Sequence, residues 1–291
     1  MKLNYINKIK ANIPLYSNKK TSNLLDGTYK SIYKGKSMNF ENLREYVVND
    51  DIKDIDWKSS ARSGTVYVKQ FIAEKKHNIL LVMDSGIKMD ADTNFHENKK
   101  NIALYTAGTF GYIGIKNNDC IGMIFSSKDK YVFKYFKNNL YNLDEYLWAY
   151  DKNNSIDPNY NIDDLLNYAS DNILKRMIII VITDFSGIDN IKTNTLKKIR
   201  LKHDLLVVNI NDNYMFGDNI FDIESNNYIA DFFLKDKKLV EIERNIRNKI
   251  ISNNIEKLKK NNVCFTTISS IKEINNKVIS LLEEHKYANR F

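Results

Sequence analysis

Short, continuous apolar runs that stop at an acidic residue are the feature of this chain that most limits its fold. The run NILLVM at residues 78–83 stops at Asp84. The run MIIIVI at 177–182 is followed by Thr183 and Asp184. Strands that are apolar at every position are buried on both faces, as in parallel sheets that helices cover on each side. The two runs therefore predict a buried parallel sheet.

Helical patterns alternate with apolar runs along the rest of the chain. Further strands are expected at 120–126, around 131–136, at 204–210 and at 263–268. Helices are expected near 97–116, 143–150, 162–174, 190–202, 238–260 and 271–286. This alternation predicts a doubly wound α/β fold on a mainly parallel sheet. Two segments, 20–76 and 213–237, do not alternate in this way and are expected to be additions to the core.

The composition is that of a soluble globular protein. Hydrophobic residues make up 43% of the 291 residues and charged residues 27%, which excludes disorder of the whole chain. No apolar run approaches the roughly 18–20 residues that a membrane-spanning helix needs, and the first residues lack the apolar core of a signal peptide. Cys120 and Cys264 are too few for a disulfide framework and are expected to be reduced thiols, with a redox pair as the alternative. We therefore expect a cytoplasmic protein.

The net charge of +8 lies almost entirely near the N-terminus. Residues 1–36 hold eight lysines and one acid, Asp26, a net of +7, whereas residues 37–291 hold 36 basic and 35 acidic residues. A nearly neutral body argues against a strongly basic groove across the fold. Nucleic acid is therefore not the expected partner of the folded body.

Residues 1–25 form a basic arm in which Leu3, Ile6, Ile9 and Ile13 have roughly helical spacing. The expected state of this arm is a frayed, solvated tail. Contact of the arm with an anionic membrane surface, a nucleic acid or another acidic partner is the alternative.

Familiar catalytic motifs do not hold in this sequence. Gly35 to Ser37 reads GKS, but Lys30 stands where a phosphate-binding loop needs its first glycine. The four histidines are scattered without metal-ligand spacing, and no Gly-x-Ser-x-Gly turn occurs. We therefore expect a protein that is not an enzyme. A magnesium-dependent hydrolase at Asp84 and Asp184 is the weaker alternative, because no convincing general base accompanies them.

Asp84 and Asp184 are the strongest candidates for a site. Because each follows a buried strand, both should lie at the carboxyl edge of the sheet, where ligands bind in open α/β folds. Two neighbouring carboxylates repel one another unless a cation, a lysine or a shared proton compensates them. Each aspartate could instead do no more than cap the helix that follows it. Their equivalent positions favour a joint site.

These two loops resemble those of von Willebrand factor A domains. Asp84-Ser85-Gly86-Ile87-Lys88 stands in the place of the Asp-x-Ser-x-Ser loop of that family, and Ile182 to Phe185 in the place of its later aspartate loop. The resemblance implies a three-layer α/β/α von Willebrand A-like fold, which is Rossmann-like in its sheet. It also implies a site at which hydroxyl and carboxylate oxygens hold Mg²⁺, with Asp84 and Asp184 as metal ligands.

The sequence departs from that pattern at the hydroxyl ligands. Gly86 and Lys88 stand where the two serines are expected, and Gly86 has no side-chain oxygen. The third loop, expected near 160–163, contains no threonine. Three carboxylates near it could take that place: Asp157, Asp163 and Asp164. We expect a degenerate metal site in which the Lys88 ammonium is the counter-ion of both aspartates, with a functional Mg²⁺ site as the alternative. Ser85 and Lys88 are then candidate interaction residues.

A second motif lies at residues 40–71, which read FENLREYVVNDDIKDIDWKSSARSGTVYVKQF. Two arginines, Arg44 and Arg62, accompany four aspartates in this segment: Asp50, Asp51, Asp54 and Asp56. Arginine binds carboxylates in two-point geometry and stacks on aromatic rings such as Trp57, so the segment can brace its own shape. A docking surface for a partner is a compatible alternative.

The same segment closely resembles the signature of the bacterial domain-of-unknown-function 58 family, in which L-R-x-Y, G-D-D, I-D-W and [ST]-A-R precede a von Willebrand A core. The matching residues are Leu43, Arg44, Tyr46, Asp50, Asp51, Ile55, Asp56, Trp57, Ser60, Ala61 and Arg62. Asn49 replaces the usual glycine, and asparagine tolerates left-handed backbone. Lys53 replaces the usual arginine and keeps its charge. The similarity runs from about Asp26 to Glu284.

This second resemblance implies a non-enzymatic protein-interaction adaptor that works with a MoxR-type AAA+ ATPase in chaperone-like assembly or maturation of client proteins. The expected parts are the basic arm (1–25), the signature segment packed on the core (26–76) and a von Willebrand A-like domain (77–291) with an insertion at 213–237. The candidate interaction residues are Ser85, Lys88, Arg44, Asp51, Asp56, Trp57 and Arg62.

Overall fold

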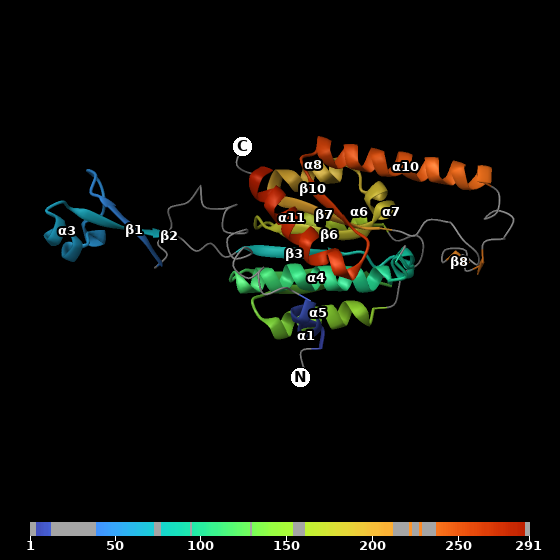
Figure 1. Ribbon diagram of the computed structural model, residues 1–291, viewed down its shortest axis with the longest axis horizontal. Helices are drawn as coiled ribbons and strands as arrows, with labels where there is room; N and C mark the ends of the chain where they lie inside the picture. The colour runs from blue at the N-terminus through green and yellow to red at the C-terminus, as the bar shows by residue number, and fades with distance from the viewer. Residues whose placement is uncertain are drawn as a thin grey trace. The chain divides into compact units, whose positions relative to one another are not determined.

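The computed structural model describes residues 4–12, 39–72, 77–93, 95–128, 130–153, 161–211, 221–222, 227–228 and 237–288 (Figure 1). The chain divides into two compact units, one of Tyr29–Lys76 and one of Met1–Thr28 together with His77–Phe291. Within the described residues, no helix is both long and apolar enough to cross a membrane.

A six-stranded sheet forms the centre of the larger unit, in the order β10-β7-β6-β3-β4-β5. Its strands are β3 (Asn78–Met83), β4 (Cys120–Ser127), β5 (Lys130–Lys137), β6 (Ile178–Asp184), β7 (Asp204–Ile210) and β10 (Cys264–Ile268). All neighbouring pairs are parallel except β4 and β5, which pair antiparallel at one edge. Every residue of β6 is buried, as its continuous apolar run predicts.

The strand order reverses between β3 and β6, which are neighbours in the sheet although β4 and β5 come between them in sequence. Met83 pairs with Ile182, so the two strands end side by side. Where strand order reverses, the chains leave in opposite directions and a crevice forms at the carboxyl edge. Asp84 and Asp184 lie at this edge, as the sequence predicts.

Helices cover both faces of the sheet (Figure 1). On one face lie α4 (Lys99–Lys116), α5 (Leu140–Asp151) and α11 (Ile274–Ala288). On the other lie α6 (Ile162–Asn172), α7 (Phe185–Asn190), α8 (Thr193–Lys202) and α10 (Lys237–Lys260). Leu80 and Val82 of β3 pack in a core with Leu165 of α6 and Leu196 of α8, while Ile79 approaches α4 at Gly114. The fold is the three-layer α/β/α, von Willebrand A-like architecture that the sequence predicts.

The helix expected near 190–202 is α8, and a further short helix, α7, precedes it at residues where the sequence pattern does not predict a helix. Asp184 accepts a hydrogen bond of 2.9 Å from the backbone N–H of Gly187 and so caps α7 directly after β6. The start of α7 therefore depends on a side-chain cap, which hydropathy periodicity does not reveal.

Part of the basic arm is a docked helix, so the expectation of a frayed, solvated tail is wrong for residues 4–12. Helix α1 (Asn4–Asn12) packs against α4 and α5 (Figure 1). Ile6 and Ile9 are buried, and Asp144 of α5 accepts a hydrogen bond of 3.0 Å from the backbone N–H of Ile6. An apolar stripe that finds a groove is not left in solvent, and a carboxylate at the first turn favours the helix. Residues 13–38 lie outside the described residues.

The smaller unit is described over residues 39–72. Strands β1 (Asn39–Glu45) and β2 (Tyr67–Ile72) pair antiparallel, and between them in the chain come the short 3₁₀ helix η1 (Ile52–Asp54) and α3 (Trp57–Ser63). Packing of this unit on the core stays a prediction. The insertion expected at 213–237 is described at β8 (Phe221–Asp222) and β9 (Asn227–Tyr228), which pair antiparallel.

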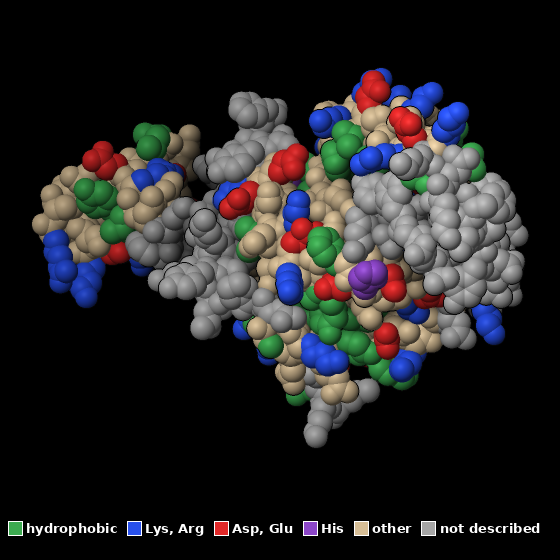
Figure 2. Space-filling view, turned by 45° about the vertical axis from the view of Figure 1, so that its right-hand side comes forward, with side chains coloured by type: hydrophobic (Ala, Val, Ile, Leu, Met, Phe, Trp, Pro, Cys, Tyr) green, Lys and Arg blue, Asp and Glu red, His purple; other side chains and the backbone are tan. Residues whose placement is uncertain are grey.

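The charges and thiols of the larger unit agree with the sequence-based expectations. On the face shown in Figure 2, basic and acidic side chains are interspersed over the described surface. Both cysteines are free, and burial raises the pKa of the Cys264 thiol to about 11. A thiol with so high a pKa is a poor nucleophile at neutral pH, so Cys264 is an inert core residue.

Candidate functional site

The ends of β3 and β6 bring two carboxylates together in the interior. Asp84 is 6% exposed and Asp184 is 2% exposed. The backbone N–H of Asp84 donates to the carbonyl oxygen of Ile182 at 3.0 Å, which extends the ladder between the strands by one step. Two neighbouring buried carboxylates require compensation by positive charge or by hydrogen-bond donors.

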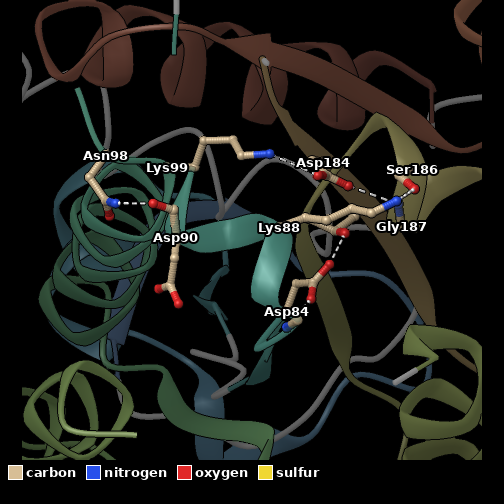
Figure 3. Close-up of polar contacts among 10 residues, drawn as sticks. Asp84, Lys88, Asp90, Asn98, Lys99, Asp184, Ser186 and Gly187 are labelled. Carbon is tan, nitrogen blue, oxygen red and sulfur yellow. Dashed lines mark hydrogen bonds and ion pairs between the residues drawn. The ribbon is translucent and has the colours of Figure 1, made fainter. Parts of the chain in front are cut away.

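The counter-ion of Asp184 is Lys99 (Figure 3). The Lys99 ammonium lies 2.9 Å from Oδ2 of Asp184, and the two side chains are 1% and 2% exposed. Oδ1 of Asp184 accepts from the backbone N–H of Gly187. Asp184 therefore joins the first residue of α4 to the first turn of α7, and both carboxylate oxygens have a partner.

Lys88, which we expected to be the counter-ion of both aspartates, has a different partner among the described residues. It lies on η2 (Ile87–Asp90), is partly exposed, and its ammonium donates to the Ser186 hydroxyl at 2.8 Å (Figure 3). The expectation is therefore wrong about which lysine pairs with Asp184. The position of Lys88 in the motif predicts its nearness to the site but does not determine where its flexible side chain ends.

Asp84 is compensated mainly by neutral hydrogen-bond donors. Its Oδ1 accepts from the backbone N–H of Gly86 at 2.8 Å, and its Oδ2 accepts from the Thr183 hydroxyl. Burial and the negative charge of Asp184 raise the pKa of Asp84 to about 6, although these hydrogen bonds and the Lys99 ammonium act in the opposite direction. Among the described residues, one ammonium thus lies near two carboxylates, and Asp84 retains a proton more readily than an ordinary aspartate because its pKa is raised.

Gly187 leaves the space in which the Thr183 hydroxyl and the Asp84 carboxylate form their hydrogen bond. A Cβ at this position would lie 1.9 Å from the Thr183 hydroxyl oxygen and 2.9 Å from Oδ2 of Asp84. Any larger side chain would therefore displace the hydrogen bond between them. Sequence reasoning did not single out Gly187, because the requirement depends on two strands and a helix.

Two further residues of the motif, Ser85 and Gly86, make no side-chain hydrogen bond among the described residues. Ser85 is 4% exposed, and its hydroxyl has no hydrogen-bond partner among the described residues. Gly86 adopts extended backbone (φ −64°, ψ 153°), a conformation open to any residue. The backbone here does not require glycine, so Gly86 differs from the serine of the von Willebrand A motif only in lacking a side-chain hydroxyl.

The residues at this edge do not fit a divalent cation as they are arranged. Lys99 occupies Oδ2 of Asp184, and within the described part of the chain no three His, Cys, Asp or Glu side chains are placed to hold a metal ion. Asp163 is buried at the start of α6, where it accepts from the backbone N–H of Lys192, and Asp164 is exposed. Asp157 lies outside the described residues. A Mg²⁺ ion needs near-octahedral oxygen ligands, which this set does not supply.

In the smaller unit, the predicted ion network is formed in part. The Arg44 guanidinium binds Asp50 in two-point geometry at 2.7 and 2.5 Å. The neighbouring Asn49 has φ +85°, the left-handed backbone that asparagine tolerates and that we expected at this position. Arg62 is exposed and forms no ion pair with the described residues, so its predicted place in the network is wrong.

Two other aspartates of the segment, Asp51 and Asp56, act as helix caps. Asp51 accepts from the backbone N–H of Lys53 and so caps η1. Asp56 accepts from the N–H groups of Lys58 and Ser59 at 3.1 Å and caps α3, which lowers the pKa of its carboxyl. A cap must hold one fixed position at a helix start, so this use of the aspartates makes the segment self-bracing.

Comparison of the sequence with known families decides where the chain belongs. A family model described as protein of unknown function DUF58 matches residues 42–217, which is more than half of the chain. The chain belongs to the DUF58 family. The match begins in β1 of the signature unit and includes the strands that position Asp84 and Asp184. No curated protein matches this DUF58 chain.

Three solved structures are distantly similar to this DUF58 protein. The conserved hypothetical protein BatB from Bacteroides thetaiotaomicron is 13% identical with a TM-score of 0.44, and the alignment covers 72% of this chain and 98% of that one. An aerotolerance-related membrane protein from Bacteroides fragilis is 14% identical (TM-score 0.42; 70% and 99% covered). The SpRpn10 VWA domain is 8% identical (TM-score 0.40; 70% and 94% covered). The von Willebrand A-like fold of the chain follows from its own strand order.

Proposed function

We propose that this DUF58 chain is a non-enzymatic adaptor that binds partner proteins at the carboxyl edge of its sheet. The observation that carries the proposal is the internal pairing of the charges there: Asp184 with Lys99, and Asp84 with the Thr183 hydroxyl. Groups that are buried and satisfied by one another are poorly placed to attack or protonate a substrate, but they hold the edge in one shape. A rigid edge suits recognition.

The rim of this edge carries the groups that a partner would meet. Lys88 and Ser186 are both partly exposed, and they come from η2 and from the first turn of α7, on opposite sides of the aspartates (Figure 3). An ammonium beside a hydroxyl recognises a carboxylate by a charge-assisted hydrogen bond. We therefore propose that the rim binds an acidic side chain of the partner.

The signature unit offers a second, apolar surface. Trp57 is 65% exposed at the start of α3, and Val48 and Ile52 are 80% and 66% exposed. Exposed aromatic and aliphatic side chains in a small unit are typical of protein-interaction surfaces. Asp51, Asp56 and the Arg44–Asp50 pair support this surface from within the unit.

The partner we propose is a MoxR-type AAA+ ATPase, which the DUF58 resemblance implies, acting with this chain in the cytoplasm on an unidentified client protein. The test is affinity purification of the tagged chain followed by identification of bound ATPases. We expect Lys88→Ala and Trp57→Ala each to lower the recovery of the ATPase without changing the thermal midpoint. Leu201→Ala is the matched control, because Leu201 is 87% exposed on α8, outside both surfaces. Undiminished recovery in both variants contradicts the proposed surfaces, and absence of any such ATPase contradicts the proposed partner.

Binding of nucleic acid or of an anionic membrane through the basic arm is the competing proposal. It requires binding that weakens steeply with salt and disappears when the arm is removed. The docking of α1 weakens this alternative for residues 4–12, because Ile6 and Ile9 face the protein interior. A filter-binding assay with single-stranded DNA and sedimentation with anionic vesicles distinguish the two sources of binding.

A further inference from the structure

Among the described residues, one lysine balances the charge of the Asp84–Asp184 pair. Both carboxylates are nearly fully buried, where an uncompensated charge is strongly unfavourable. Among the described residues, the ammonium in contact with either carboxylate is that of Lys99, at 2.9 Å from Asp184. Loss of this ammonium would leave two like charges in one buried site.

The fold fixes Lys99 firmly in this place. Lys99 is the first residue of α4, whose preceding residue Asn98 caps the helix through a side-chain hydrogen bond to Asn101. The backbone N–H of Lys99 donates to the carbonyl oxygen of Ala91 at 2.9 Å. A lysine in the first helical turn is unfavourable against the helix dipole, so this residue gains its stability from the aspartates rather than from the helix.

We propose that Lys99 is a tethered counter-cation that takes the place of an exchangeable divalent ion at the Asp84–Asp184 pair. While Lys99 is present, the site is independent of metal, because a divalent ion would have to displace a buried ammonium from its partner. When the side chain is shortened, the site becomes a site for a hard divalent cation such as Mg²⁺ or Mn²⁺. This inference concerns the chemistry of the site and does not depend on the adaptor function.

Part of the oxygen ligand set for such a cation would become available once Lys99 is shortened, and water would have to supply the rest. Shortening Lys99 exposes Oδ2 of Asp184, and Oδ2 of Asp84 lies against the Thr183 hydroxyl. Mg²⁺ commonly keeps several waters and binds through one or two carboxylates, and Mn²⁺ takes a similar oxygen set. Shortening the lysine chain would vacate space beside Oδ2 of Asp184, where the ion would lie.

The experiment compares full-length wild type, Lys99→Ala and Lys99→Met. Thermal midpoints are measured in EDTA and in millimolar MnCl₂ or MgCl₂, and free Mn²⁺ is followed by electron paramagnetic resonance during titration. We expect no metal-dependent shift in the wild type. Lys99→Ala should melt about 10 °C lower in EDTA, because a buried ion pair has lost one partner. Metal should restore several degrees of this loss, with uptake of one ion per chain.

Two variants make the result specific. Lys99→Met keeps a long chain without charge, so it should be destabilised as strongly and take up no metal. Lys99→Ala combined with Asp184→Asn should lose the metal response. Lys134→Ala, which breaks the partly exposed pair with Glu145, is the control for loss of a lysine elsewhere and should show no response.

Stoichiometric metal in the wild type that Asp184→Asn removes would overturn the proposal. A Lys99→Ala protein that takes up no Mn²⁺ would overturn it as well. If Lys99→Ala does not fold in EDTA, the soluble yield after refolding with and without Mn²⁺ replaces the melting experiment. Equal yields then contradict the proposal, and a higher yield with Mn²⁺ supports it.

Discussion

The phenol of Tyr150 donates a hydrogen bond of 2.6 Å to the backbone carbonyl oxygen of Asp84, and so connects α5 to the end of β3. Tyr150 is fully buried, and burial together with the nearby carboxylates raises its pKa well above 10, so the phenol remains a donor at every physiological pH. The loop that carries the candidate site is therefore held from the helical layer beneath it as well as from the neighbouring strand.

Replacement of Tyr150 by phenylalanine should weaken this hold. The change removes one hydroxyl and leaves the Asp84 carbonyl without that donor, so we expect the free energy of unfolding to fall by about 1–3 kcal/mol. Urea denaturation measures the difference. Tyr141→Phe is the control, because Tyr141 is 59% exposed on the same helix, and its effect should be near zero. Equal effects of the two substitutions would mean that the buried hydrogen bond adds nothing.

Asp84 should make the stability of the protein decrease with rising pH. Its carboxyl has a pKa of about 6 in the folded state, against an ordinary value of 3.8, so between these two pH values the folded state binds more protons than the unfolded state. The free energy of unfolding therefore falls as pH rises from 3.8 to 6, by up to about 3 kcal/mol.

Asp84→Asn should remove this dependence. The variant should be more stable than the wild type at pH 7 and lose the advantage as the pH approaches 4. Urea unfolding at several pH values gives the difference between the two proteins, which cancels the contribution of all other titrating groups. A variant that is less stable than the wild type at pH 7 would show that ionised Asp84 is favourable, against the raised pKa.

Gly187→Ala should be among the most damaging small substitutions in the chain. The new methyl group would lie 1.9 Å from the Thr183 hydroxyl oxygen, and relief of that overlap must move α7 or the end of β6. We expect a loss of about 3 kcal/mol in unfolding free energy. Adding Thr183→Ala should recover part of this loss, because it removes the overlapping oxygen. Ser186→Ala, one residue earlier and partly exposed, should have a much smaller effect.

Because α1 is docked on α4 and α5, replacing a buried apolar residue of the basic arm should lower the stability of the whole larger unit. Ile9 is 2% exposed, and its side chain lies where a Cβ on Gly108 of α4 would be. Ile9→Ala should lower the free energy of unfolding by about 2–4 kcal/mol, and Lys8→Ala, on the exposed side, by less than about 0.5. Thermal denaturation of both variants decides the point. If Ile9→Ala has no effect, the helix is not held against α4 in solution.

The sheet and the positions of Asp84 and Asp184 could be predicted because they depend on local patterns. A buried parallel strand must be apolar at every position, and the chain order of strands and helices then determines which ends share an edge. The Arg44–Asp50 pair and the left-handed backbone of Asn49 could also be predicted, because these residues lie within a few positions of one another in the sequence.

The role of Lys99 could not be predicted in the same way. Its partner Asp184 lies 85 positions away, at the end of β6. The strand that directly follows α4 in the chain is β4, so chain order does not place Lys99 beside Asp184. Lys88 is nearer to Asp84 in sequence and is therefore the counter-ion that the motif predicts, but its ammonium donates to the Ser186 hydroxyl. The one local signal for Lys99 is a lysine in the first turn of a helix, where the dipole disfavours it.

His203 should make the protein sensitive to acid. It is 1% exposed at the turn between α8 and β7, and neither ring nitrogen has a hydrogen-bond partner among the described residues. Burial and the neighbouring Lys202 and Arg176 lower its pKa below 6.5, although Asp204 opposes them. Below pH 6.5 the unfolded state therefore binds more protons at His203 than the folded state does. The contribution of neutral His203 to the free energy of unfolding is fully present above that pH and is lost as the pH falls through the folded-state pKa.

His203→Leu should therefore flatten the acid limb of the stability profile and leave stability at pH 7.5 unchanged or raised by about 1 kcal/mol, because two unsatisfied nitrogens are removed. The nearby His285, whose pKa burial also lowers, should retain part of the acid sensitivity. Urea midpoints between pH 5 and pH 7.5 measure the difference, and His96→Asn, at an exposed position with φ +55°, controls for loss of a histidine as such. If the urea midpoints of the wild type and His203→Leu change in parallel with pH, the prediction is contradicted. Such a result would mean that His203 has the same charge in the folded and unfolded states over this range, or that its ring gains a partner when it is protonated.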